Sequence, residues 1–306
     1  MPGPPRARPT TVPSTVVTTT RVLVPPQSPP ITNGSFTTHM LRRTRPESQD
    51  DNDRMTIGAD SYLAAVRAAI DHVATTQADG VRRAADLVTA ALRAGGVVQA
   101  FGAGHSEALA MEIAGRAGGL VPANKIALRD LVLFGGADRT VLNDPFLERD
   151  PAVAHRLFEL VPVEPADVFV IASSSGVNGV VVELARIVKE HGHGLIAVTS
   201  LAHTMAVSPK HPSGRRLADL ADVVLDNGAP YGDAALPVGD GGAKVGAISS
   251  ITGALLAQQL VCEVVARIVA SGETPPIYIS YNVPGGDEHN RQLEARYAGR
   301  IRRTAS

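Results

Sequence analysis

The chain contains one cysteine, Cys262, among its 306 residues. A single cysteine excludes a disulfide within the chain and a zinc site built from several cysteines. This cysteine usage fits a reducing compartment, so we expect a cytoplasmic protein. Cys262 has the apolar neighbours Val261 and Val264. We therefore expect it to be a small buried side chain rather than a nucleophile.

The chain also lacks an excess of charge of either sign. It carries 29 Lys and Arg against 30 Asp and Glu, a formal net charge of -1. The basic pairs Arg42-Arg43 and Arg302-Arg303 are short and lie toward the ends of the chain, so we expect solvated ends, and no helix-turn-helix module is evident. We expect no nucleic-acid partner, and any anionic ligand must be held by local geometry.

Long hydrophobic runs are absent as well. A membrane-spanning helix requires about 18 apolar residues in succession. The most apolar stretch, residues 243–270, is broken by Ser, Thr, Gln and Glu. The sequence therefore predicts no membrane partner.

Residues 1–55 differ in composition from the rest of the chain. They are rich in Pro, Thr and Arg and include Pro25-Pro26 and Pro29-Pro30. Such a segment cannot bury enough apolar surface to offset the entropy lost on ordering, so we expect a disordered tail. It lacks the apolar centre of a secretion signal, and Met55 would be a sensible internal start. We expect residues 56–306 to form one domain.

The remaining chain shows a repeated order of elements. Helical spacing of apolar residues from Asp60 to Ala94 predicts two helices, which end at Gly95-Gly96. Strand, loop and helix then alternate: we expect strands at 97–101, 168–172, 195–198, 222–225 and 277–280, and helices at about 107–116, 180–191 and 245–269. Repeated units of this kind predict a doubly wound α/β fold with a parallel sheet. Ligands of such sheets bind beyond the carboxyl ends of the strands, so we expect the loops at 102–106, 173–179, 199–204 and 226–233 to converge.

The loop Ser173-Ser174-Ser175-Gly176-Val177-Asn178 joins a predicted strand to a helix N-terminus. It offers hydroxyl groups, free N–H groups and the positive end of a helix dipole, which together favour a phosphate monoester. The alternative is an ordinary capping loop. Capping needs only one Ser or Asn, so the composition favours the anion site.

The loop Gly102-Ala103-Gly104 has only part of a dinucleotide-binding pattern. Glu107 stands where the third glycine of GxGxxG would be, and the chain has no phosphate-loop lysine at the required place. We therefore expect no cofactor. The glycines fit better with a close approach of the backbone and Ser106 to a ligand.

These two loops resemble those of the sugar-isomerase (SIS) family. Residues 173–178 resemble its SxSGxT phosphate motif, with Asn178 where Thr is common, and residues 102–106 resemble its GxGxS loop. The stretches FGAGHSEALAMEIAGRAGGLVP, HPSGRRLADLADVVLDNGAPYGDAAL and NVPGGDEHN are similar to an SIS subgroup related to phosphoheptose isomerases. The resemblance spans roughly 59–301 and implies a flavodoxin-like three-layer sandwich. It implies that phosphate is held by Ser106, Ser173, Ser175 and Asn178.

The resemblance leaves the catalytic base open, because Arg116 stands where several SIS enzymes have a catalytic glutamate. Glu112 lies one turn earlier on the same helix face and is the candidate base. The alternative is a solvated carboxylate paired with Arg116. His105, His203 and His289 lie in expected loops, and one of them is a candidate acid, with His105 the best placed. No histidine pair has the spacing of a helical metal site, so no metal is implied.

The sequence thus predicts a phosphosugar-binding enzyme. The candidate catalytic residues are Glu112, His105 and His289, and the candidate substrate contacts are Gly104, Ser106, Ser173, Ser174, Ser175, Asn178, Ser200, His203 and Asp233. The preferred substrate is an N-acetylated amino-sugar 6-phosphate, which loses the proton on carbon 2 and then undergoes elimination, as in a lyase or dehydratase. The alternatives are an aldose-ketose isomerase and a non-catalytic phosphosugar sensor.

The apolar residues of the predicted helix 245–269 spread around more than one face. A sheet covers only one face, so we expect a homodimer or larger assembly to cover another. Resemblance to the SIS family adds that subunits often share active sites, which would let His105 or His289 act across the interface. The alternative is that the helices predicted at 60–94 cover the remaining face within the same chain.

Overall fold

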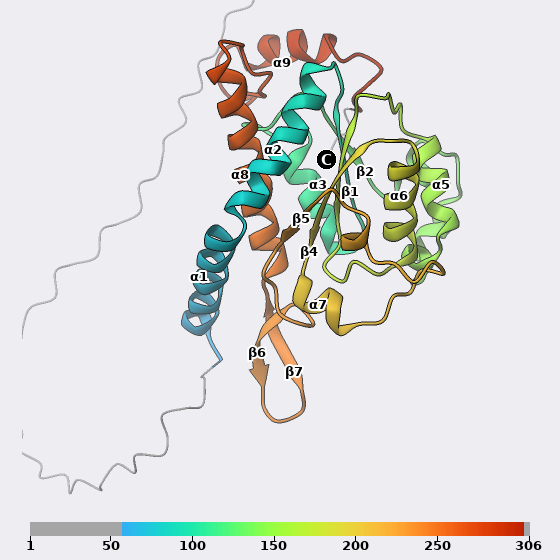
Figure 1. The fold of residues 1–306 in the computed structure, drawn as a ribbon, viewed down its shortest axis with the longest axis vertical. Coiled ribbons are helices and arrows are strands. Elements are labelled where there is room, and N and C mark those ends of the chain that lie inside the picture. Colours follow the sequence, from blue (N-terminus) through green and yellow to red (C-terminus); the bar gives the residue numbers. More distant parts are fainter. Residues whose placement is uncertain (1–56, 303–306) are drawn as a thin grey trace, which may run out of the picture. The chain divides into compact units, whose positions relative to one another are not determined.

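A computed structural model of the chain describes residues 57–302 (Figure 1). The chain divides into two units, Met1–Asn52 and Asp53–Ser306, and all of the described elements belong to the second. The expected tail at residues 1–55, including Arg42-Arg43, lies outside the described residues, as does Arg303.

Five parallel strands form the central sheet in the order β2-β1-β3-β4-β5. The strands are β1 (Val98–Gly102), β2 (Ala123–Ile126), β3 (Val168–Ala172), β4 (Gly194–Thr199) and β5 (Val223–Asp226). This order is that of flavodoxin-like doubly wound folds. The predicted fold class is confirmed.

Side chains of β3 show how helices cover both faces of the sheet. Val170 packs in one apolar cluster with helices on the first face, and the next residue, Ile171, packs in a second cluster with helices on the other. Successive side chains of a strand point to opposite faces, so a strand buried on both sides is apolar throughout. The first face carries α1 (Ala59–Thr76), α2 (Ala78–Arg93), α3 (Glu107–Ile113) and α8 (Ser249–Ala270); the second carries α4 (Asp130–Leu133), α5 (Ala152–Glu159) and α6 (Gly179–Glu190) (Figure 1).

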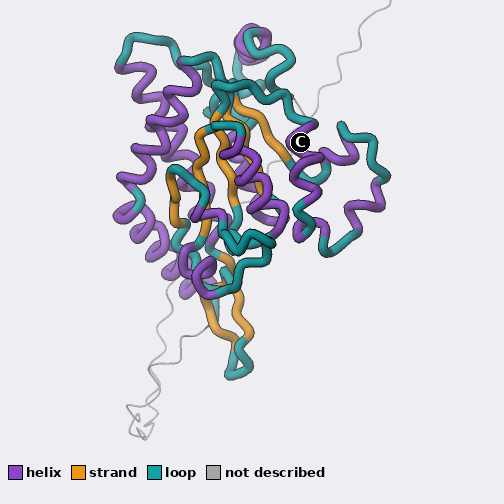
Figure 2. The backbone as a smooth tube through the Cα atoms, turned by 45° about the vertical axis from the view of Figure 1, so that its right-hand side comes forward, coloured by secondary structure: helices purple, strands orange, loops and turns teal. Residues whose placement is uncertain are grey.

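Two predicted elements differ from the structure. The predicted helix 245–269 begins only at Ser249, because residues 243–247 form β7 (Ala243–Ala247), which pairs with β6 (Ala234–Val238) in an antiparallel hairpin. Gly246 has a φ of 83°, which no α-helix accommodates. The hairpin extends beyond the end of the sheet (Figure 2). The predicted strand 277–280 is reduced to an isolated antiparallel bridge between Leu120 and Ile277.

Helix α8 is the one helix of the described residues with the length and composition to cross a membrane. Core helices can have the same composition, and α8 packs against α1, α2 and α3 within the chain. Of these, α1 and α2 are the two helices predicted at 60–94, which would cover the second apolar face of α8 within one chain and so make an oligomer unnecessary. Cys262 of α8 is exposed, which corrects the expected buried position: it lines an open groove between α8 and α2, beside Ala78 and Val81.

Arg302, near the C-terminal end, also differs from expectation. Its guanidinium lies 4.2 Å from the centre of the Phe134 ring and 3.6 Å from the carboxylate of Asp130. Arg302 is therefore packed against the domain rather than solvated.

The remaining described α-helices are the last helix, α9 (Gly286–Ala295), and the short α7 (Leu201–Ala206).

We predict that Gly102→Ala destabilises the protein. A Cβ at Gly102 would meet the carbonyl oxygen of Ser106 at 2.1 Å, so the loop after β1 would have to move. Forcing such a contact costs about 1–3 kcal/mol, measurable by urea unfolding. Gly194→Ala is the matched control, because its Cβ would meet only Val168, at 3.4 Å. Equal free energies of unfolding for the two variants would show that the loop after β1 moves without cost, and would contradict the prediction.

Candidate functional site

The central strands end in line at one edge of the sheet. Gly102 of β1 is paired in register with Ala172 of β3, and Ala172 with Val198 of β4. The loops that follow these three strands therefore start side by side, as the sequence predicts for a parallel sheet.

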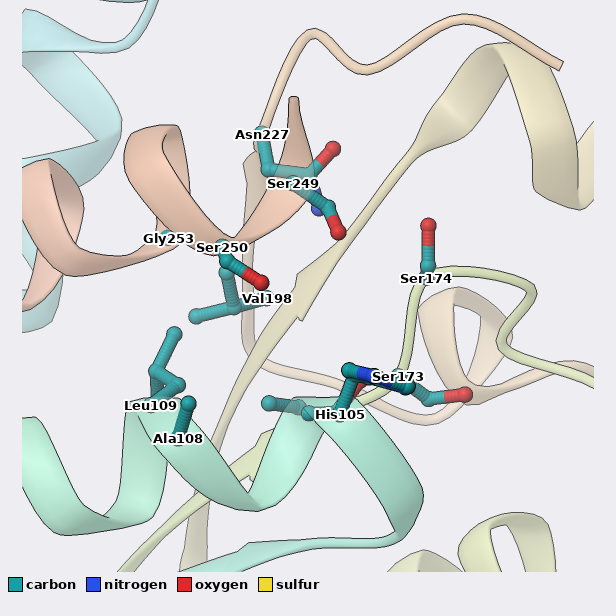
Figure 3. A pocket seen from close by; sticks show the side chains of 12 residues that line it. His105, Ala108, Leu109, Ser173, Ser174, Val198, Asn227, Ser249, Ser250 and Gly253 are labelled. Carbon is teal, nitrogen blue, oxygen red and sulfur yellow. The ribbon is translucent and has the colours of Figure 1, made fainter. Parts of the chain in front are cut away.

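A small pocket that opens to solvent lies at this edge (Figure 3). Its walls come from the loop after β1, the loop after β3, the end of β4, the residue after β5 and the first turn of α8. The lining residues are His105, Ser106, Ala108, Leu109, Ala172, Ser173, Ser174, Val198, Asn227, Ser249, Ser250 and Gly253. Of the predicted site residues, four thus line this one pocket: His105, Ser106, Ser173 and Ser174.

The serine loop contains one hydroxyl that the protein leaves without a partner. Ser173 Oγ accepts a hydrogen bond from the Gly176 N–H at 3.1 Å and so shapes the turn. Ser174 Oγ is buried and has no hydrogen-bond partner, although Ser174 lines the pocket. A buried hydroxyl without a partner costs about 1–3 kcal/mol. A ligand oxygen in the pocket would remove this cost.

The serine loop is held rigidly from behind. Gly176 has a φ of 63°, and a Cβ there would approach the hydroxyls of Thr199 and Thr204 at 3.1 and 3.0 Å. Thr204 Oγ1 donates to the Ser175 carbonyl at 2.9 Å, and the Leu217 N–H donates to the Gly176 carbonyl at 2.8 Å. These contacts fix the loop in one conformation before any ligand arrives.

Several predicted substrate contacts lie behind the pocket wall rather than on it. Asn178 donates to Glu148 at 3.0 Å. Ser200 is fully buried, with its hydroxyl donating to the Ala229 carbonyl at 2.6 Å and accepting from the His203 N–H at 3.0 Å. The Ser200 hydroxyl is thus used within the protein, which corrects its expected role.

Four further predicted contacts are placed beside the pocket rather than in its lining. The His203 ring packs edge-on against Tyr231, with ring centres 5.2 Å apart. Gly104 has a φ of 58°, which shapes the loop after β1. The Ser175 carbonyl accepts a hydrogen bond from the Thr204 hydroxyl, which holds the serine loop in place. Asp233 accepts hydrogen bonds from Ser249, which lines the pocket, so Asp233 contacts the pocket only through Ser249.

The candidate base Glu112 faces away from the pocket lining. Its carboxylate forms an ion pair with Arg116 and accepts a hydrogen bond from Gln258 Nε2 at 2.9 Å. The ion pair is the alternative that the helical spacing left open. His289 hydrogen-bonds to the Ile277 carbonyl at 2.9 Å, and its helix α9 lies at the opposite end of the sheet from the β6–β7 hairpin (Figure 1). Within one chain neither residue reaches the pocket.

Ser249, Ser250 and Gly253 line the pocket but were not among the predicted site residues, whereas the sequence pointed to Asp226-Asn227 as a pair that could bind sugar hydroxyls or simply form a turn. A weak signal existed for Asn227, which follows an apolar strand. The serines gave none, because the apolar pattern extended the predicted helix back to Val245 and placed them within its first turns.

No Asp, Glu, Lys or Arg is among the pocket-lining residues. Glu107, at the start of α3, is paired with Lys125 at 3.2 Å and with Arg129. The described part of the chain also holds no group of three or more His, Cys, Asp or Glu side chains arranged for a metal ion. Serine hydroxyls, backbone N–H groups and helix termini are therefore the groups that this pocket offers to an anion.

Comparison with known proteins identifies the family. The SIS-domain pattern matches residues 61–200. A UPF0309 protein of Listeria monocytogenes is 36% identical over 244 residues, covering 79% of this chain and 97% of the relative. One from Geobacillus kaustophilus is 35% identical over 240 residues, covering 78% and 94%. The chain belongs to the SIS-domain family.

Solved structures are similar at lower identity. The phosphoheptose isomerase of Francisella tularensis is 17% identical, with a TM-score of 0.47 over 67% of this chain and 95% of that chain. The SIS-domain match over residues 61–200 confirms the family resemblance expected from the two loops.

Behind the serine loop, this SIS-domain protein has a buried ionic cluster. Glu183 of α6 is 6% exposed and accepts from Arg186 Nε at 2.9 Å, from His155 at 2.7 Å and from His211 at 2.8 Å. His211 belongs to the segment whose Lys210 N–H bonds to the Val177 carbonyl of the serine loop. The cluster therefore anchors the segment that supports the loop.

Hydrogen bonding to Arg186 is the largest effect on Glu183 and lowers its pKa to about 2, against the opposing effect of burial. A carboxylate whose pKa is lower in the folded state stabilises the fold above its unfolded pKa, and that stabilisation disappears as the pH falls through the folded value. The ordinary pKa is 4.5, so the loss falls between about pH 4.5 and pH 2.

We predict that Glu183→Gln removes this acid-dependent loss. The wild type should lose on the order of 3 kcal/mol more free energy of unfolding than the variant over that pH range, as measured by urea unfolding. Glu190→Gln is the control, because Glu190 pairs with the same Arg186 but its side chain is 56% exposed. Identical pH profiles for wild type and Glu183→Gln would contradict the prediction.

Proposed function

We propose that this SIS-domain protein binds a sugar phosphate with the phosphate in the serine loop. The observation that carries the proposal is the Ser174 hydroxyl, which is buried, unpartnered and part of the pocket wall. The N-terminus of α6, a helix of 12 residues, follows the same loop and adds the positive end of its dipole. The ligand is a small molecule, and the serine loop supplies its anion contacts without lysine or arginine.

The proposed reaction begins at carbon 2 of the sugar. A base removes the proton on that carbon, next to the aldehyde, and the electron pair then expels the substituent on carbon 3, which leaves with a proton. His105 is the only histidine on the pocket wall and is the group we assign to proton transfer. Glu112 is held by Arg116 and Gln258, so its part in the reaction would require a neighbouring subunit or a rearrangement.

Elimination is our first choice because an N-acetyl group on carbon 2 blocks simple enediol formation. The same first step followed by return of the proton to carbon 1 gives an aldose-ketose isomerase. A sensor that binds the phosphosugar without turnover is the alternative of another class.

We predict that turnover separates these possibilities. When the protein is incubated with hexosamine and heptose phosphates, elimination of water lowers the product mass by one water, whereas isomerisation conserves mass. His105→Asn should lose turnover and retain phosphosugar binding, since the serine loop is intact. Binding by the wild type without any turnover would establish a sensor instead.

We predict that Ser174→Ala weakens phosphosugar binding and raises the free energy of unfolding of the ligand-free protein by up to about 1–3 kcal/mol, because the buried hydroxyl makes no bond within the protein. A hydrogen bond to a charged group contributes about 1.5–3 kcal/mol, so calorimetry should show a Kd raised roughly 10- to 100-fold. The Ser173→Ala, Ser175→Ala double variant should also bind more weakly. Ser208→Ala, at an exposed position outside the pocket, is the control. Unchanged affinity in folded Ser174→Ala would exclude the phosphate cradle.

We propose that the active form is a homodimer or larger, placed in the cytoplasm. His289 lies away from the pocket of its own chain, so a contribution from it requires a second subunit. Light scattering at micromolar concentration should give at least twice the mass of one chain. A fully active single chain of 31.9 kDa would contradict both the assembly and a shared site.

A further inference from the structure

The pocket wall opposite the serine loop carries a hydrogen-bond donor of fixed direction. Asn227 is 4% exposed, and its amide oxygen accepts from the Ala229 N–H at 3.0 Å. This bond fixes which end of the amide is oxygen, because a backbone N–H requires an acceptor. The amide nitrogen makes no hydrogen bond within the described residues, and Asn227 lines the pocket beside Ser249 (Figure 3).

Ser249, next to it, presents an acceptor of fixed direction. Its hydroxyl donates to Asp233 Oδ2 at 2.8 Å, and its backbone N–H donates to Asp233 Oδ1 at 2.8 Å. An ionised carboxylate only accepts, so the serine proton is committed to Asp233 and the oxygen lone pairs remain for a ligand. Asp233 has a φ of 69°, the one positive φ outside glycine in the described chain, and holds this strained conformation while making these bonds.

An apolar surface lies beside this donor and acceptor. Leu109 and Val198 line the pocket on the side away from Ser173 and Ser174, and Gly253 of α8 faces the same space (Figure 3). A Cβ at Gly253 would meet only Leu109 Cδ1, at 3.5 Å, so the glycine leaves room for a small group.

We propose that this wall recognises the acetamido group of a 2-acetamido sugar phosphate. Asn227 Nδ2 donates to the acetyl carbonyl oxygen, Ser249 Oγ accepts from the amide N–H, and the methyl group packs against Leu109 and Val198. The inference rests on the proposed function, since the serine loop must hold the phosphate for the sugar to reach this wall.

Other substituents on carbon 2 fit the wall less well. A hydroxyl group satisfies the donor and the acceptor but leaves the apolar surface in contact with water. A free amine is a cation, and Asp233, the carboxylate bonded to Ser249, is already engaged with Ser249 and with the backbone of Ile248. Burying that cation without a carboxylate partner is unfavourable.

The test is calorimetry with N-acetylglucosamine 6-phosphate, glucosamine 6-phosphate and glucose 6-phosphate. We expect the wild type to bind the acetamido sugar about 10-fold more tightly than the other two, because only its methyl group covers the apolar surface and because the amine would bury an unpaired charge. Equal affinities for the three would overturn the acetamido site and leave the phosphate site standing. Binding of none would overturn both proposals.

Gly253→Ala tests the same wall by size. Alanine suits the helix and meets Leu109 at an ordinary contact distance, so the variant should fold, as thermal melting will verify. We expect affinity for the acetamido sugar to fall about 10-fold and affinity for glucose 6-phosphate to stay within about 2-fold. Ser249→Ala should weaken binding of the acetamido sugar and of glucose 6-phosphate alike, because both can donate to its hydroxyl oxygen, and Gly194→Ala, outside the pocket, should weaken neither. An equal loss for all three sugars, or none, in Gly253→Ala would overturn the inference.

Discussion

The alignment of three parallel strands is the constraint on which the site depends. Because Gly102 and Ala172, the last residues of β1 and β3, pair in register with Val198, one residue before the end of β4, three chain reversals must share one edge of the sheet. Close packing then fixes where each loop lies: a Cβ at Gly102 would come within 2.1 Å of the Ser106 carbonyl oxygen. The pocket is thus a consequence of strand geometry, and its chemistry comes from the residues that these loops carry.

The protein separates charge from the pocket wall. Glu107 is neutralised by Lys125 and Arg129, Asp233 by hydrogen bonds from Ser249, and Glu183 by Arg186 and two histidines. Each of these carboxylates supports an element that borders the pocket. The wall itself offers dipoles and hydroxyl groups, which can bind a phosphate without a competing ion pair nearby. Binding by oriented dipoles requires a rigid loop, and the bonds from Thr204 and Leu217 to the serine loop supply that rigidity.

The two walls of the pocket have different chemical character. The serine loop carries a buried hydroxyl at Ser174 and a helix N-terminus, whereas the wall of Asn227 and Ser249 carries one donor, one acceptor and an apolar surface. The first wall suits a phosphate, which all phosphosugars share. The second is the wall that can distinguish one phosphosugar from another.

The sequence by itself determined the strand, loop and helix units that contain β1, β3, β4 and β5, the bounds of β3 and the position of the serine loop at a helix N-terminus, because these depend on local patterns of apolar and turn residues. It did not predict β2 or the β6–β7 hairpin. It also carried the family resemblance. Only the tertiary structure decided that Ser249 and Asn227 face Ser173, that Glu112 pairs with Arg116 and Gln258, and that Cys262 is exposed. The apolar pattern from residue 245 does not form a helix until Ser249, because Gly246 has a positive φ. The spacing of apolar residues does not reveal a backbone angle. Contacts between residues far apart in the chain depend on how helices pack on the sheet, which local patterns do not specify.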